Sequence, residues 1–448
     1  MTSASVIRRL LRSVSGGQGT DASGADRHTR KAVTLCRALL SQRGEASGAA
    51  IAREVLASYN ALQGRALEAF FDALAREFSP DPKEVERAAE AYRMEPTQTE
   101  LVRLMKVVEP SRQELFRRLN LASGGTAALV EMRRAVLHRL NSHPDWTGIE
   151  ADLAHLLDSW FNRGFLVLQR IDWSTSALIL EKLIQYEAVH AIQGWKDLRR
   201  RLQADRRCFA FFHPALPDEP IIFIEVALTR GISDEVQTLL DPESPVTDPS
   251  RANCAIFYSI TNCQEGLRGI SLGSFLIKQV AEILGREFPR LKTFSTLSPV
   301  PGFRVWLSDA QEQLAGVPGG ASLAKQLRCL DEPDWHTRAD LAGALEEPLL
   351  HLCAYYLLHA KRDEEPFDPV ARFHLGNGAR MEKLNWLADT SVPGMERSAG
   401  IMVNYVYELD DIERNHEAYA NRHEIVCAAK FLLLARQCPL ARRVRPRS

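Results

Sequence analysis

The sequence lacks any long apolar run and any excess of charge of one sign. Its longest apolar stretches, such as residues 221–228, are interrupted by charge at Glu225 and fall well short of the roughly 20 residues that a membrane helix needs. Lysine and arginine number 56 against 57 aspartate and glutamate, which leaves a formal net charge of -1. Such a chain has no sequence-wide positive field to hold a nucleic-acid backbone. We therefore expect neither a membrane protein nor a nucleic-acid-binding protein.

Paired cysteines and zinc signatures are also missing. The 8 cysteines are scattered without a Cys-x-x-Cys pair, in a chain of 448 residues that is too large to need disulfide stapling. No His-Glu-x-x-His motif is present. We expect reduced thiols in a cytosol-like compartment and no metal site. A hydrophobic content of 45% allows substantial cores, and the length suggests roughly two to three domains.

The first residues are basic and poor in acids. Arg8, Arg9 and Arg12 precede the first acidic residue, Asp21. We expect residues 1–25 to form a flexible leader of a cytoplasmic bacterial protein. The alternative is a mitochondrial transit peptide, which has a similar composition and would place the chain in the mitochondrial matrix.

Apolar residues then recur at three- and four-residue spacing from about Arg30 to Trp160, as amphipathic helices require. The spacings of Thr97 to Glu100 and of Ser111 to Glu114 are those of capping boxes at helix starts. The clearest apolar series are Leu67, Phe70, Phe71 and Leu74, then Leu101, Leu104, Met105 and Val108. We predict a helical domain over residues 26–162 that carries no recognisable chemistry and serves oligomerisation.

The pattern changes after the break at residues 162–164. Short runs rich in β-branched and aromatic residues predict strands at residues 209–213, 221–227, 255–259 and 293–297. The segment from Ser271 to Phe288 lies between the last two and has the apolar spacing of an amphipathic helix. This order predicts a β-α-β unit whose sheet edge is open to a ligand. We expect one second domain over residues 163–448.

A glycine-rich turn separates the strand at residues 255–259 from this helix. Gly266, Gly269 and Gly273 would let the backbone approach a ligand, and a following helix start favours phosphate. The alternative is a loop that needs glycine only for its turns. The turn resembles the pyrophosphate loop of GNAT acyltransferases. It also matches the Gly-x-Ser-x-Gly nucleophile elbow around Ser271, but that serine lies too far beyond Ser259 at the strand end, so we expect it at the helix start.

Two further residues have a suggestive setting. Ser298 follows the last predicted strand, and Pro299 and Pro301 restrict the turn after it, so the hydroxyl lies where α/β sheets bind ligands. The alternative is an ordinary capping serine. His374, flanked by apolar residues, could equally be a hydrogen-bonded core histidine.

Taken together, these segments resemble the malonyl-CoA decarboxylase family. The resemblance is dense from about Tyr186 to Tyr407 and thin across the helical region. The segments that carry it are residues 255–260, 264–269, 272–278, 286–289, 297–303, 373–379 and 404–407.

The resemblance implies an α+β two-domain fold, in which an all-α N-terminal domain precedes a GNAT-like α/β acyl-CoA-binding catalytic domain. It implies that Ser298 and His374 are the catalytic residues. The implied substrate-binding residues are Arg268, Gly269, Ile270, Ser271, Leu272, Gly273 and Ser274, with Asn377, Asn404 and Tyr407 as further candidates for oxyanion contacts. Arg268 and Ser271 differ from the residues of animal members, and the C-terminal peroxisomal signal of the family is missing.

The implied reaction is the decarboxylation of malonyl-CoA to acetyl-CoA and CO2. The thioester itself accepts the electrons, so the reaction demands no cofactor, and the expected partners are malonyl-CoA and further copies of the chain in a dimer or tetramer. An N-acyltransferase and a non-catalytic malonyl-CoA sensor are the rival functions. The arginines at 199–201, 206 and 207 could meet the CoA 3′-phosphate, but we expect them on a solvated face.

Overall fold

The structure is a computed structural model that describes residues 24–41, 44–270, 272, 276–318, 320–332 and 334–443. Most of the predicted leader and the candidates Ser271, Gly273 and Ser274 lie outside these residues. The chain divides into two compact units. The helical unit comprises residues 1–167, 212–219 and 264–272, and the sheet unit comprises residues 168–211, 220–263 and 273–448.

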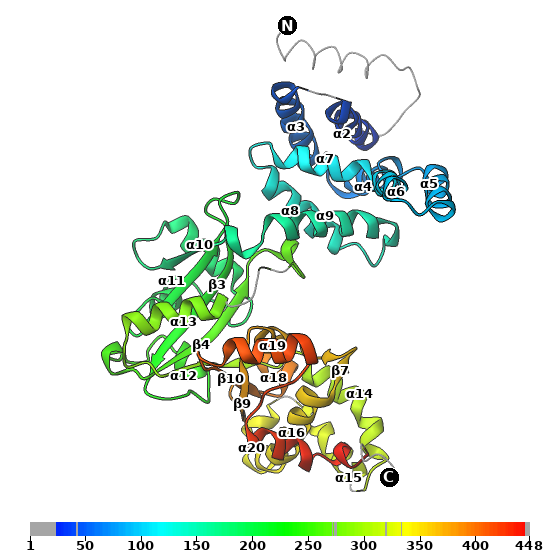
Figure 1. Cartoon of the computed structure of the whole chain (residues 1–448). Coiled ribbons are helices and arrows are strands. Elements are labelled where there is room, and N and C mark those ends of the chain that lie inside the picture. Colours follow the sequence, from blue (N-terminus) through cyan, green and yellow to red (C-terminus); the bar gives the residue numbers. More distant parts are fainter. Residues whose placement is uncertain are drawn as a thin grey trace. The chain divides into compact units, whose positions relative to one another are not determined.

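The helical unit contains the predicted run of helices (Figure 1). They are α2 (Gly24–Ser41), α3 (Glu45–Asn60), α4 (Gly64–Glu77), α5 (Pro82–Met94), α6 (Gln98–Val108), α7 (Ser111–Asn120), α8 (Gly125–Leu137) and α9 (Thr147–Trp160). Phe70, Phe71 and Leu74 of α4 are fully buried in its core, beside Trp146. The apolar periodicity of the sequence therefore marks the side of α4 that packs inward.

Only half of the capping box predicted at Thr97 forms, because the Thr97 N–H donates to the carbonyl of Glu95 and not to the Glu100 side chain. The Thr97 hydroxyl accepts a hydrogen bond from the Glu100 N–H at the start of α6. The helix start predicted at Ser111 is confirmed, since α7 begins there, but the capping box does not form, because Pro110 precedes the first turn and the Ser111 hydroxyl donates to the carbonyl of Phe78. The hydroxyl thus donates to a distant carbonyl instead of accepting from the local Glu114 N–H.

The sheet unit is built on one mixed sheet of eight strands. Its strands are β1 (Val167–Ile171), β2 (Arg206–Phe212), β3 (Pro220–Thr229), β4 (Cys254–Asn262), β5 (Thr293–Thr296), β6 (Ser298–Pro299), β9 (Arg380–Asn385) and β10 (Met402–Tyr407), in the order β1-β2-β3-β4-β5-β10-β6 with β9 also paired to β10. The main helices are α10 (Ala177–Tyr186), α11 (Trp195–Arg201), α12 (Gln237–Leu240), α13 (Leu276–Glu287), α14 (Phe303–Ala315), α15 (Gly320–Leu327), α16 (Ala339–His359), α17 (Pro369–Gly376), α18 (Val392–Ser398), α19 (Ile412–Arg422) and α20 (Ala429–Gln437). Strands β7 (Lys361–Arg362) and β8 (Glu365–Pro366) form a separate hairpin, and short 3-10 helices lie at Pro144–Trp146, Arg163–Phe165, Pro249–Arg251, Glu265–Leu267, Arg328–Asp331, Trp335–Thr337 and Pro439–Arg443.

The predicted β-α-β unit is present, since β4 and β5 are parallel and α13 connects them. Strand β10 then pairs antiparallel with both β5 and β6, which are one strand interrupted at Leu297. At the interruption the Leu297 N–H donates to the carbonyl of Phe257 on β4 at 3.0 Å. The interruption separates Ser298 from β5, but Val403 of β10 still pairs with Ser298. The expected fold class, a helical region followed by a domain with a mixed sheet, is confirmed.

The prediction of a solvated arginine face is wrong for four of its five members. Arg200, Arg201, Arg206 and Arg207 are at most 8% exposed. Arg201 donates to Glu225 at 2.7 Å, and Arg207 to Glu287 at 2.6 Å. These carboxylates come from β3 and α13, so the partners that compensate for burial are remote in the sequence.

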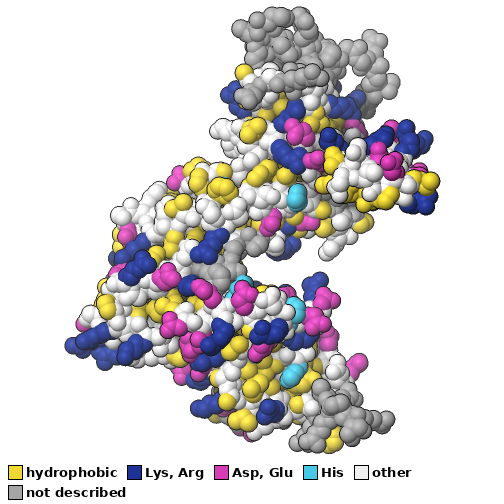
Figure 2. Space-filling model, in the orientation of Figure 1, with side chains coloured by type: hydrophobic (Ala, Val, Ile, Leu, Met, Phe, Trp, Pro, Cys, Tyr) yellow, Lys and Arg dark blue, Asp and Glu magenta, His cyan; other side chains and the backbone are white. Residues whose placement is uncertain are grey.

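Acidic and basic side chains are interspersed on the face drawn in Figure 2, in agreement with the near-zero net charge. No helix among the described residues is long and apolar enough to cross a membrane.

Candidate active site

Ser298 and His374 lie side by side, although 76 residues separate them in the sequence. Ser298 begins β6, and His374 lies in the last turn of α17, a helix that Asp368 and Pro369 start. The Ser298 hydroxyl oxygen and His374 Nε2 are 2.9 Å apart, a hydrogen-bond distance. The sequence therefore identified two side chains that the fold brings into direct contact.

His374 is held on its other side by the aromatic residues of β10. The hydroxyl of Tyr407 lies 2.8 Å from His374 Nδ1, and the ring of Tyr405 stacks on the imidazole with centroids 4.4 Å apart. Only 2% of His374 is exposed, and burial lowers the pKa of its imidazole to about 3. Burial also raises the pKa of Tyr407 well above its usual value, so at neutral pH both groups are uncharged.

Thr296 sets the direction of the Ser298 hydroxyl. This hydroxyl donates to Thr296 Oγ1 at 2.9 Å, and the backbone N–H of Tyr405 donates to the same oxygen at 3.2 Å. With its hydrogen committed to Thr296, the Ser298 oxygen is left to accept from His374 Nε2–H. His374 Nδ1 then accepts from Tyr407, which assigns the neutral imidazole its Nε2–H tautomer.

The predicted candidate Asn404 contacts the backbone of Thr296, at the end of this hydrogen-bond chain. It is fully buried, and its amide nitrogen donates to the carbonyls of Thr296 at 2.8 Å and Ser233 at 3.1 Å. Its side-chain oxygen accepts from the Asn385 amide at 2.7 Å. Because both amide hydrogens are committed to backbone oxygens, Asn404 positions the strand carrying Thr296 and has no hydrogen free for an oxyanion.

The predicted candidate Asn377 ends α17. Its amide nitrogen donates to the carbonyl of Phe373 at 2.8 Å, and 7% of the residue is exposed. It therefore terminates the helix that carries His374, three residues beyond the histidine.

Asp368 connects the turn after Ser298 with the helix that carries His374. Its carboxylate accepts from the N–H groups of Val370 and Ala371, both at 2.9 Å, and so caps α17. Burial raises the pKa of this carboxyl to about 6, and hydrogen bonds from backbone groups, that of Gly302 among them, oppose the rise. One side chain thus fixes both segments that supply the serine and the histidine.

The glycine-rich turn belongs to the helical unit, where α8 holds it. Arg133 donates to the carbonyls of Gly266 at 2.7 Å and Arg268 at 2.9 Å. A Cβ on Gly266 would lie 2.0 Å from the carbonyl oxygen of Val130, so the turn requires glycine there. Gly269 has φ +79°, with open space where a Cβ would lie, and it is exposed together with Arg268.

The remaining candidates in this turn differ in exposure. Ile270 is half-buried, and Leu272 is buried with 7% exposed. Ser271, Gly273 and Ser274 fall in the stretches that the structure leaves undescribed.

Sequence reasoning missed Thr296, Asp368 and Arg133. Thr296 lies two residues before Ser298, a spacing that places both on one face of a strand, and this signal could have identified it. The Asp368-Pro369 pair has the pattern of a helix start, although nothing in it indicates the contact with the turn after Ser298. Arg133 interacts with carbonyls more than 130 residues away, for which the sequence gives no local sign.

Within the described part of the chain, no group of three or more His, Cys, Asp or Glu side chains could hold a metal ion. Comparison with protein families gives two matches. Residues 164–441 match the malonyl-CoA decarboxylase C-terminal domain, and residues 78–161 match the malonyl-CoA decarboxylase N-terminal domain.

Individual proteins give the same result. Mitochondrial malonyl-CoA decarboxylase of Rattus norvegicus is 36% identical over 359 residues, which are 75% of this chain and 73% of the rat protein. The crystal structure of malonyl-CoA decarboxylase from Rhodopseudomonas palustris is 52% identical, with a TM-score of 0.86 over 90% of this chain and 98% of that chain. That from Agrobacterium vitis is 50% identical, with a TM-score of 0.83 over 90% of this chain and 99% of that chain.

Proposed function

Because the chain belongs to the malonyl-CoA decarboxylase family, we propose that it converts malonyl-CoA to acetyl-CoA and CO2 by means of Ser298 and His374, without a cofactor. The observation that carries this proposal is the contact of 2.9 Å between the Ser298 hydroxyl and His374 Nε2. The contact is part of a buried chain that runs from Tyr407 through His374 and Ser298 to Thr296.

The reaction needs a proton donor at C2 of the malonyl group. When the bond between C2 and the carboxylate breaks, its electron pair moves into the thioester as an enolate and CO2 leaves. In our proposal the bound malonyl group replaces Thr296 as the acceptor of the Ser298 hydroxyl hydrogen, Ser298 passes this proton to C2, and His374 Nε2–H replaces it on the serine. So that the imidazole stays neutral, Nδ1 takes the Tyr407 hydroxyl proton as Nε2–H leaves, and the one proton that the reaction consumes comes from solvent and restores Tyr407.

Burial supports these roles. Ser298 is 6% exposed and His374 is 2% exposed, so neither group has to shed a full hydration shell before it acts. The neutral imidazole, whose pKa burial lowers to about 3, keeps its Nε2 hydrogen directed at Ser298 as long as Tyr407 donates to Nδ1. We therefore assign Tyr407 the role of a positioning residue that fixes the tautomer.

We further infer that the segment from Arg268 to Ser274 binds the phosphates of the CoA moiety. The support is the exposed Gly269 with its positive φ, beside the exposed cation of Arg268. Arg133 stabilises this conformation of the turn from α8.

The decisive experiment supplies purified protein with malonyl-CoA alone and measures CO2 release and acetyl-CoA. An N-acyltransferase would need an amine acceptor, and a sensor would bind without turnover. His374→Ala should lower turnover on the order of 10²- to 10⁴-fold, with a smaller effect on affinity for malonyl-CoA. His359→Ala, at an exposed histidine ending α16, is the matched control and should keep its activity. Near-normal turnover of the His374 variant would reject the assignment.

We also propose a role in malonyl-CoA and fatty-acid metabolism for a homo-oligomeric enzyme. Helix α6 supports self-association, because it buries none of its residues and leaves Val102, Met105 and Val108 between 43% and 61% exposed. No disulfide joins any of the 8 cysteines, all of which lie among the described residues, and this supports a reducing compartment such as the bacterial cytoplasm or the mitochondrial matrix.

A further inference from the structure

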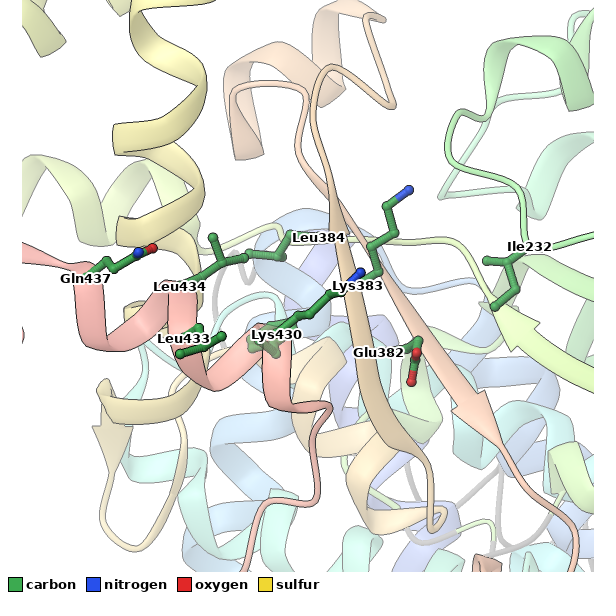
Figure 3. A pocket seen from close by; sticks show the side chains of 9 residues that line it. Ile232, Glu382, Lys383, Leu384, Lys430, Leu433, Leu434 and Gln437 are labelled. Carbon is green, nitrogen blue, oxygen red and sulfur yellow. The ribbon is translucent and has the colours of Figure 1, made fainter.

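The sheet unit has a groove between the edge strand β9 and the C-terminal helix α20 (Figure 3). Its cavity volume is about 500 Å³, within the range of roughly 300 to 1,000 Å³ that is typical of small-molecule sites. None of the residues proposed above for catalysis lines it. We call this cavity the alkyl groove. Its apolar lining residues are Ile232, Leu384, Phe431, Leu433 and Leu434.

The apolar walls of the alkyl groove come from three segments. Leu384 of β9 is 6% exposed and points toward α20, on which Leu433 and Leu434 lie (Figure 3). By contrast, Leu433 is 55% exposed and Ile232, in the loop after β3, is 41% exposed. Large side chains left in contact with water around one cavity indicate a surface that an apolar ligand would cover.

Lys430 supplies positive charge beside these walls, whereas the Lys383 side chain points away from α20, on the other side of β9 from Leu384 (Figure 3). Lys430 of α20 has no ion-pair partner among the residues that the structure describes, and Lys383 of β9 has only Asp234, at 3.9 Å. The carboxylate of Glu382, which also lines the groove, accepts from Arg380 at 2.7 Å and points away from both lysines (Figure 3). The groove thus combines an apolar floor with a cation that has little competing negative charge.

We propose that the alkyl groove binds a medium-chain alkanoate such as decanoate, with its chain on Leu384, Leu433 and Leu434 and its carboxylate at Lys430. The chemistry is complementary at both ends, since the leucines bury methylenes and the Lys430 ammonium pairs with the carboxylate. A second protein chain fits less well, because 9 residues line the groove whereas a stable interface uses roughly 20 to 30 residues on each side.

The first test titrates the full-length protein with hexanoate, octanoate and decanoate by isothermal calorimetry. Binding should saturate at one site per chain and tighten roughly two- to fourfold for each added methylene. Decanol, which has the same chain without the charge, should bind more weakly than decanoate. Binding that does not saturate, or that does not depend on chain length, would show that the groove is no alkanoate site.

The second test uses variants of the groove. Lys430→Gln should weaken decanoate roughly two- to fivefold, as loss of an exposed ion pair does, and should leave decanol binding unchanged, whereas Lys383→Gln should change decanoate binding little. The matched control is Lys292→Gln, at an exposed lysine before β5, and it should bind decanoate like the parent protein. An equal loss in the Lys292 variant would mean that only general charge attraction is measured, and the proposal would fail.

Leu433→Gln distinguishes a ligand from a second copy of the chain. It should weaken both decanoate and decanol while leaving the oligomeric state unchanged. If it instead alters the oligomeric state and the parent protein binds no decanoate, the groove is a contact between copies. His374→Ala should bind decanoate as the parent does, so this test stands whether or not the proposed catalytic roles are correct.

Discussion

At the scale of single residues, the direction of one hydroxyl hydrogen determines what the Ser298 and His374 pair can do. If the Ser298 hydroxyl donated to His374, the serine would be set up as a nucleophile, as in acyl-transfer enzymes. Its hydrogen bond to Thr296 instead leaves His374 as the donor, which suits delivery of a proton to a carbanion. Thr296 thereby separates the proposed reaction from that of a hydrolase with similar side chains.

Replacing Thr296 tests this role. Thr296→Val keeps the shape but removes the acceptor, so Ser298 should turn toward His374 and turnover should fall by roughly tenfold or more, while the Michaelis constant for malonyl-CoA changes little. Thr296→Ser retains the hydroxyl and should restore most of the turnover. If valine and serine behave alike, the hydroxyl has no part in orienting Ser298.

The buried imidazole gives a prediction about pH. The pKa of His374 is about 3 in the folded protein, against an ordinary value of 6.5 in the unfolded chain. Below pH 6.5 the unfolded state therefore binds a proton that the folded state excludes. The stability contributed by a neutral His374 is fully present above pH 6.5 and is lost as pH falls toward 3.

Chemical unfolding of the parent protein and of His374→Gln at pH 7.5 and pH 5 measures this effect. The parent should lose about 2 kcal/mol more than the variant between the two conditions, because glutamine does not titrate. An equal loss in both proteins would mean that His374 is protonated in the folded state.

At the scale of elements, a glycine allows the turn after Ser298 to lie against a helix of the sheet unit. A Cβ on Gly302 would lie 2.4 Å from the hydroxyl oxygen of Tyr356 in α16, although the φ of -90° would itself permit alanine. The Tyr356 hydroxyl also donates to Asp368, the residue that caps α17. Close packing of three segments therefore fixes the position of the serine relative to the histidine.

Gly302→Ala should therefore destabilise the folded protein by roughly 1–3 kcal/mol, as overpacking does. Both the melting temperature and turnover should fall. Tyr356→Phe removes the oxygen that clashes and leaves the nearest ring carbon 3.5 Å from the new methyl group. The double variant should therefore recover most of what Gly302→Ala loses, as thermal unfolding and CO2 release would measure. Additive losses in the double variant would show that the steric explanation is wrong.

The same scale shows how far sequence reasoning reaches. Local periodicity was enough for the strands of the β4-α13-β5 unit and for the buried face of α4, because each depends on the residues of the element itself. It failed for Arg201 and for the capping box at Ser111, where Glu225 and the carbonyl of Phe78 are the partners. Ser298 and His374 were identified through the family resemblance, whereas Thr296 and Asp368 required knowledge of which segments pack together.

At the scale of the whole molecule, a residue of the helical unit determines the conformation of the proposed substrate-binding turn. Arg133 is 4% exposed and ion-paired to Glu150 at 2.6 Å, while it donates to the two carbonyls of the turn. His138, which directly follows α8, contacts Glu265 at 2.6 Å. The N-terminal helices, which carry no recognisable chemistry in the sequence, thus act on the turn by holding its backbone.

Arg133→Met preserves the apolar part of the side chain and removes all of these hydrogen bonds. Each lost bond from a charged donor is worth roughly 1.5–3 kcal/mol, so the turn should populate other conformations and the Michaelis constant for malonyl-CoA should rise by roughly tenfold. Turnover at saturation should change little, because the Ser298 and His374 contact depends on other segments.

The matched control for this prediction is Arg134→Met. Arg134 is the next residue of α8, but its side chain is 45% exposed, its ion pair is with Glu131 of the same helix, and its attraction to Glu265 of the turn acts without a direct contact. Its loss should leave the Michaelis constant unchanged, because an exposed pair of this kind contributes little. Steady-state kinetics well below both melting temperatures would compare the two variants. If both raise the Michaelis constant equally, the charge of α8 is responsible, and the conformation of the glycine turn is not set by Arg133.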